Sequence, residues 1–97
     1  AGENGKETVA HRLRPKVLRR RWVYEAVEPR RLSRFVGHRV RLQERGDPVR
    51  SGVLAEVREG KAVVEQRVRG GRFMAYLSLK ELVRSEVLVR KVVEEPV

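Results

Sequence analysis

The stretch from Arg39 to Val68 limits most strongly what this chain can fold into. It contains three runs rich in β-branched residues, R-V-R-L-Q-E-R, V-R-S-G-V-L-A-E-V-R and K-A-V-V-E-Q-R-V, separated by Gly-Asp-Pro and Glu-Gly. Short runs in which apolar and polar residues alternate are typical of half-buried strands, and Gly, Asp and Pro supply the chemistry of tight turns. The stretch therefore predicts a bent meander of three strands. The bulge or bend is expected at Gly52, within the second run, because glycine inside a strand often marks such a feature.

Apolar spacing predicts further elements on either side of this meander. Glu28 to Gly37 is expected to form a short helix, because Pro29 suits a first turn and Leu32, Phe35 and Val36 fall on one face. Residues 22–27 alternate and are expected to form an extra edge strand or an extended segment across the barrel. The predicted strands cover residues 38–44, 49–58, 61–69, 72–79 and 83–93. We therefore predict an all-β fold, a small five-stranded antiparallel barrel with a short N-terminal helix.

A chain of 97 residues is one domain, or one domain with an arm. We expect residues 1–21 to form a flexible basic arm and residues 22–97 to form the barrel domain. The composition is 40% hydrophobic and 37% charged, so the core must be small and the surface densely charged.

No apolar run is long enough to span a membrane, and the N-terminus lacks the apolar stretch of a signal peptide. A cytoplasmic location is therefore the expectation. The sequence leaves open whether it is a whole protein or part of a longer one.

Positive charge gathers near the N-terminus. The net charge is +10, and residues 12–34 contain nine basic residues against two acids. Such asymmetry indicates a polyanionic partner, either nucleic acid or an anionic membrane surface. Nucleic acid, and RNA in particular, is the expectation, because arginine offers planar bidentate donors to phosphate. Trp22 and Tyr24 beside the arginines could add base stacking on a single strand. The predicted nucleic-acid-binding residues are Arg12, Arg14, Lys16, Arg19, Arg20, Arg21, Trp22, Arg30, Arg31 and Arg34.

Catalytic and metal sites have no sequence support. Cysteine is absent, so disulfides, thiol catalysis and thiolate metal sites are excluded. The two histidines, His11 and His38, are far apart, and no serine or threonine lies in a nucleophile motif. We therefore expect a protein that is not an enzyme and that needs neither a metal nor another cofactor.

The order of elements resembles the Sm-like and SH3-like small barrels, and it is also similar to the small C-terminal barrel of ribosome maturation factors. The resemblance covers Pro29 to about Val92. It is carried by V-x-L (Val40, Leu42), by G-x-L-x-x-V (Gly52, Leu54, Val57), and by S-L-K-E-L leading into E-V-L-V.

This resemblance implies a fold and leaves the binding site open. Sm-like RNA binders typically have a polar Asp/Asn motif between their second and third strands and an Arg-Gly motif between their fourth and fifth. The corresponding segments here read R-E-G-K and L-S-L-K-E-L. The resemblance therefore does not transfer an RNA pocket to this chain.

A second hypothesis comes from another class of protein. Small barrels of this kind also serve as accessory modules that contact a protein partner or a neighbouring domain. The adjacent apolar pairs Val53-Leu54 and Val63-Val64 would leave some residues facing outward, which suits docking or homo-oligomer formation. The run R-R-R-W-V-Y would then be a linker, or a segment after a membrane helix outside this chain.

Overall fold

The computed structural model describes residues 18–96, and within them the chain is mostly antiparallel β-sheet. The all-β class is confirmed. The strands are β1 (Leu18–Ala26), β2 (Arg39–Leu42), β3 (Arg50–Arg58), β4 (Lys61–Val68), β5 (Gly71–Ser78) and β6 (Leu88–Pro96). The 3-10 helix η1 (Pro29–Phe35) lies between β1 and β2, and the 3-10 helices η2 (Leu79–Glu81) and η3 (Arg84–Glu86) lie between β5 and β6.

The six strands form one open sheet in the order β1-β6-β2-β3-β4-β5. The additional strand relative to the five expected is β1, which pairs with β6 from Leu18↔Pro96 to Ala26↔Leu88. Residues 18–21, assigned above to the basic arm, are therefore the first residues of β1. The helix η1 follows β1 in the chain, so it lies between two strands of the sheet and does not precede all of them.

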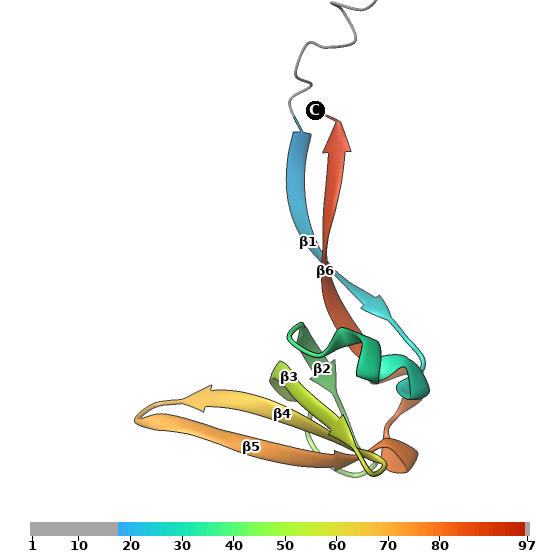
Figure 1. The fold of residues 1–97 in the computed structure, drawn as a ribbon, viewed down its shortest axis with the longest axis vertical. Helices are drawn as coiled ribbons and strands as arrows, with labels where there is room; N and C mark the ends of the chain where they lie inside the picture. Colours follow the sequence, from blue (N-terminus) through green and yellow to red (C-terminus); the bar gives the residue numbers. More distant parts are fainter. Residues whose placement is uncertain (1–17, 97) are drawn as a thin grey trace, which may run out of the picture.

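Two antiparallel ribbons project from the packed part of the sheet in different directions (Figure 1). One consists of β1 and β6, and the other consists of β4 and β5. Because each ribbon continues past the core, its outer residues stay exposed on both faces. Examples are Leu18 and Val92 on the first ribbon, and Val68 and Phe73 on the second.

The core lies where β2, β3, β4 and β6 meet η1 and the segment after β5. Leu32 of η1 is fully buried there, and Val27 and Phe35 pack beside it. Val40 and Leu42 point inward from β2, as their alternation predicts. The buried hydrophobic residues of this cluster are Leu32, Val40, Leu42, Leu54, Ala62, Val64, Leu77, Leu82, Val87 and Val89.

The segments after β2 and after β5 are joined by backbone hydrogen bonds. The Arg45 N–H donates to the Glu81 carbonyl at 2.9 Å, and the Val83 N–H donates to the Gln43 carbonyl at 2.8 Å. An isolated antiparallel bridge joins Glu44 to Leu82 between them. These bonds hold η2 against the core.

A β-bulge in β3 explains the irregular apolar spacing of that strand. The pairing with β4 shifts between Leu54 and Glu56, so Ala55 is the extra residue. A bulge resets the alternation of side chains between the two faces. For this reason Leu54 and Val57, three residues apart, both contact the core.

Gly52 allows β3 to approach β4 closely. A Cβ atom at this position would lie 2.2 Å from the Glu65 carbonyl oxygen and 2.9 Å from Cγ1 of Val64. The sequence prediction placed a bend at Gly52. In the structure the irregularity falls after Leu54, and Gly52 is required by the short distance between strands.

We predict that Gly52→Ala lowers the free energy of unfolding by roughly 1 to 3 kcal/mol, because an added methyl group would push β3 away from β4. Urea unfolding followed by circular dichroism measures this change. The matched control is Gly71→Ala, where an added Cβ meets no heavy atom within 4 Å. Equal midpoints for the two variants would contradict the role given to Gly52.

Candidate nucleic-acid interface

Trp22 lies on the outer face of the β1–β6 ribbon and is 60% exposed. The Arg90 guanidinium stacks on its ring, 4.0 Å from the ring centroid. Arg90 belongs to β6 and lies two residues before Val92, the partner of Trp22 in the register, so it is diagonally across from the indole on the same face. A cation held over an indole face is favourable, and more so when it is partly desolvated. The contact fixes the indole while leaving much of its surface open to solvent.

Tyr24 extends this arrangement along the same face, since residues two apart on a strand point the same way. Tyr24 is opposite Arg90 in the register of β1 and β6. The Arg41 guanidinium of β2 lies 5.7 Å from the centroid of the Tyr24 ring. Two exposed aromatic rings are therefore combined with arginines from two neighbouring strands.

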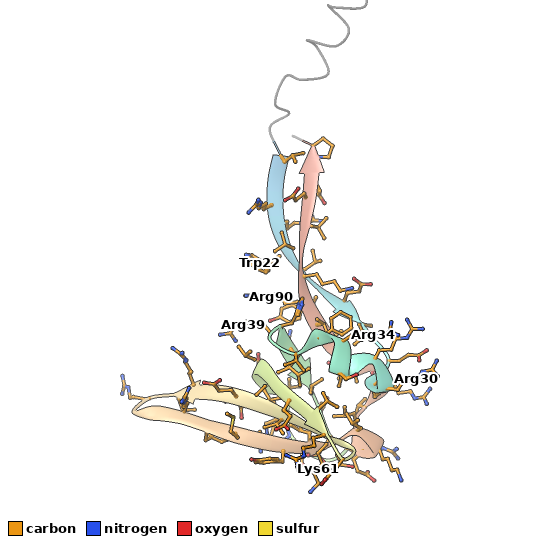
Figure 2. All side chains as sticks on the ribbon, in the orientation of Figure 1. Trp22, Arg30, Arg34, Arg39, Lys61 and Arg90 are labelled. Carbon is orange, nitrogen blue, oxygen red and sulfur yellow. The ribbon has the colours of Figure 1, made fainter. Side chains whose placement is uncertain are left out.

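Arg39 lies between two hollows on this side of the sheet. The first, the Trp22 hollow, has a volume of about 380 Å³ and is lined by Trp22, His38, Arg39 and Arg90 among others. The second, the Gly52 hollow, has a volume of about 140 Å³ and reaches Arg67 of β4. Because both include Arg39, they adjoin. Figure 2 shows Trp22, Arg90 and Arg39 near one another beside the β1–β6 ribbon.

We call Trp22, Tyr24, Arg39, Arg41 and Arg90 the Trp22 surface. Within residues 18–96, its three arginines have no carboxylate within ion-pair distance. The Arg90 Nε atom is shielded from solvent and has no hydrogen-bond partner in this part of the chain. Buried polar atoms usually have a partner, so this unpaired donor is unusual.

Several arginines predicted to bind nucleic acid already have acidic partners. Arg20 contacts Glu94 at 3.2 Å and Arg21 contacts Glu95 at 2.7 Å across the β1–β6 ribbon. These pairs are solvent-exposed, and such pairs typically contribute only about 0–1 kcal/mol. They reduce the local positive charge without removing the arginines from reach of a phosphate.

The structure places the described residues of the predicted site in two separate regions, β1 and η1. Trp22 and Arg20 lie on one face of β1, and Arg19 and Arg21 lie on the other because the strand alternates. The three arginines of η1, at positions 30, 31 and 34, form a separate group. Arg30 and Arg34 appear on the other side of the ribbon from Trp22 in Figure 2. Arg12, Arg14 and Lys16 lie outside the described residues.

Sequence reasoning missed three members of the Trp22 surface, namely Arg39, Arg41 and Arg90. The signal for the first two was present, since the alternation of β2 already directs them outward from Val40 and Leu42. A search for runs of positive charge does not find them, because these arginines are dispersed along the sequence. Their grouping depends on strand order, which places β6 between β1 and β2.

The β4–β5 ribbon adds a further basic group near its turn. Arg67 lines the Gly52 hollow, whereas Arg72 pairs with Glu65 at 3.2 Å. Tyr76 of β5, 65% exposed, and Met74 share this ribbon. The cationic and aromatic character of the Trp22 surface thus continues onto a second ribbon.

Other kinds of site have little support in residues 18–96. No group of three or more His, Asp or Glu residues there is arranged to hold a metal ion. None of the helices in this part of the chain has the length and apolar character needed to cross a membrane.

No protein-family model, curated protein or solved structure matches the chain.

Glu28 offers a measurable test of the η1 geometry. Arg30 Nε donates a hydrogen bond to its carboxylate at 2.6 Å. This bond and the charge of Arg30, then the charges of Arg31 and Arg84, lower the pKa of Glu28 from its ordinary value. We predict that Arg30→Gln raises the pKa of Glu28 toward that value.

A carboxyl-carbon NMR titration measures this pKa directly. Because the folded-state pKa is lowered, the stabilisation from this pair is present above the ordinary pKa and is lost as pH falls through the folded value. Arg58→Gln, which removes a cation from the β3–β4 turn, is the control and should leave Glu28 unchanged. An unaltered Glu28 titration in Arg30→Gln would contradict the contact.

Proposed function

We propose that this protein is a non-enzymatic nucleic-acid-binding domain that binds single-stranded RNA through the Trp22 surface. The observation that carries this proposal is the grouping of two exposed aromatic rings with three arginines that have no acidic partner in the described chain. Base stacking on an aromatic side chain and phosphate binding by arginine are the two recurring elements of single-strand recognition.

The overall charge supports the same partner. Residues 18–96 contain 19 Lys and Arg against 11 Asp and Glu, a net charge of +8. Phosphate neutralisation by such a surface gives affinity that falls steeply with salt. The basic residues Arg12, Arg14 and Lys16 precede β1 in the sequence, and in this proposal they add further phosphate contacts.

The five-stranded SH3/Sm-like barrel is proposed as the architecture behind this surface. Strands β6-β2-β3-β4-β5 are consecutive in the sheet, and the bridge between Glu44 and Leu82 joins the segments that follow β2 and β5. In this proposal β1 is an added strand on β6. Its role is to place Trp22 and Tyr24 beside the arginines of β2 and β6.

An accessory interaction domain is the second candidate, and it has its own observation. Both sheet edges are free of strand partners within the described chain, and β5 exposes Phe73, Met74 and Tyr76. A free edge with apolar side chains can pair with a strand from a protein partner, a neighbouring domain or a second copy. This candidate requires binding through β5, whereas the RNA proposal requires the Trp22 surface.

We predict that Trp22→Ala weakens binding to a fluorescein-labelled single-stranded RNA by about 1–3 kcal/mol, the typical effect of losing one base–aromatic stack. Trp22→Phe should retain most of the affinity. Fluorescence anisotropy at low salt measures these constants. Arg39→Gln should also weaken binding, and Arg58→Gln is the charge-matched control outside the surface.

Two results would count against this proposal. One is the absence of any binding to RNA at low salt. The other is an equal loss of affinity in Arg39→Gln and Arg58→Gln, which would indicate unspecific attraction by net charge. If RNA does not bind and the chain dimerises or captures a defined partner through β5, the accessory candidate replaces it.

The basic segment before β1 gives a separate prediction. Arg12→Gln, Arg14→Gln and Lys16→Gln together should reduce the dependence of log affinity on log salt concentration by about 2, since each lost phosphate contact on a single strand changes this slope by about 0.7. Anisotropy titrations over a salt series measure the slope. An unchanged slope would show that these residues make no phosphate contact.

A further inference from the structure

A third cation-lined cavity, apart from the two hollows described above, lies where η1, η2 and η3 meet the β3–β4 turn. Its volume is about 520 Å³, which is within the usual range for small-ligand sites. Three helical segments each contribute one cation to its wall, Arg30 from η1, Lys80 from η2 and Arg84 from η3. Pro29 and Leu79 supply an apolar part of the lining.

One carboxylate of the protein already lies among these three cations. The Glu28 carboxylate at the cavity wall accepts a hydrogen bond from Arg30 Nε at 2.6 Å. Arg30, Arg31 and Arg84 all lower its pKa, Arg30 most strongly. The field at this position therefore favours negative charge. Three lining cations against this one carboxylate leave positive charge in excess.

We propose that this cavity binds a phosphate monoester attached to a flat or apolar body. The phosphate would contact Arg84, Lys80 and Arg30, since guanidinium groups match phosphate geometry and ammonium groups add point charge. The body would rest against Pro29 and Leu79. Free nucleotides have this chemistry, and so does the terminal phosphate of a nucleic-acid strand.

This phosphate site is independent of the RNA binding proposed for the Trp22 surface. The cavity and the Trp22 surface share no residue. In this cavity a ligand phosphate and the Glu28 carboxylate would compete for Arg30. Removal of the carboxylate should therefore strengthen ligand binding.

The first experiment is an NMR titration of the full 97-residue chain with adenosine 5′-monophosphate at low salt, using the amide signals. Saturable shifts are expected at Arg30, Gly60, Lys80 and Arg84, and adenosine without phosphate should produce none. Arg84→Gln should weaken binding by roughly tenfold to a hundredfold, the usual range for a hydrogen bond to a charged group. Lys80→Gln is an independent second variant, and Arg69→Gln is the charge-matched control at the β4–β5 turn.

The second experiment tests the competition directly. Glu28→Gln should bind adenosine 5′-monophosphate more tightly than the parent chain. Glu94→Gln changes the net charge equally on the β1–β6 ribbon and should leave the affinity unchanged. If both variants gain equally, or if shifts spread over all arginines without saturation, the cavity is not a phosphate site.

The source of the phosphate is decided by a third titration, with the same short RNA carrying either a 5′-phosphate or a 5′-hydroxyl. Shifts at the four cavity amides with the phosphorylated strand alone would identify a nucleic-acid end as ligand. Shifts with the free nucleotide alone would identify a nucleotide. If neither ligand shifts these amides, the proposal is wrong, whatever the Trp22 surface binds.

Discussion

The register of β6 is the constraint on which the other features depend. This strand pairs with β1 on one side and with β2 on the other. Val89 is fully buried in the core, and the next residue, Arg90, stacks on Trp22 from the outer face. A slip of one residue would exchange these faces and place a guanidinium in the core. Core packing around Val89 therefore also fixes the cation beneath the indole.

The distribution of ion pairs determines which arginines are ready for a ligand. On the β1–β6 ribbon, Glu94 and Glu95 pair with Arg20 and Arg21. The arginines of the Trp22 surface have no such partner in the described chain. Since exposed pairs are weak, a phosphate can displace Glu94 or Glu95 at modest cost. The unpaired arginines would gain most from a phosphate, and the paired ones would add smaller increments.

Alternation predicted the β2 face correctly, with Val40 and Leu42 inward and Arg39 and Arg41 outward, because period-two patterning follows directly from strand geometry. It could not predict which strand lies beside which, and for that reason Arg90 was not connected with Trp22. The bulge after Leu54 was also beyond reach. A chain with Leu54 and Val57 three residues apart gives no sign of whether an extra residue or a bend accounts for the spacing. Gly52 was recognised as unusual, but only the distance to Glu65 shows that it serves close strand approach.

The separation of the basic residues follows from the packing of η1. Leu32 must face the core and Phe35 packs against it, so Arg30, Arg31 and Arg34 are directed away from that contact. β1 alternates instead and directs Trp22 to the outer face of its ribbon. Basic residues that are close in the sequence therefore do not form one surface in the fold. The fold contains two cationic regions with different neighbours. One contains aromatic rings and unpaired arginines, which suits stacked bases, and the other contains an internal carboxylate, which suits a single competing anion.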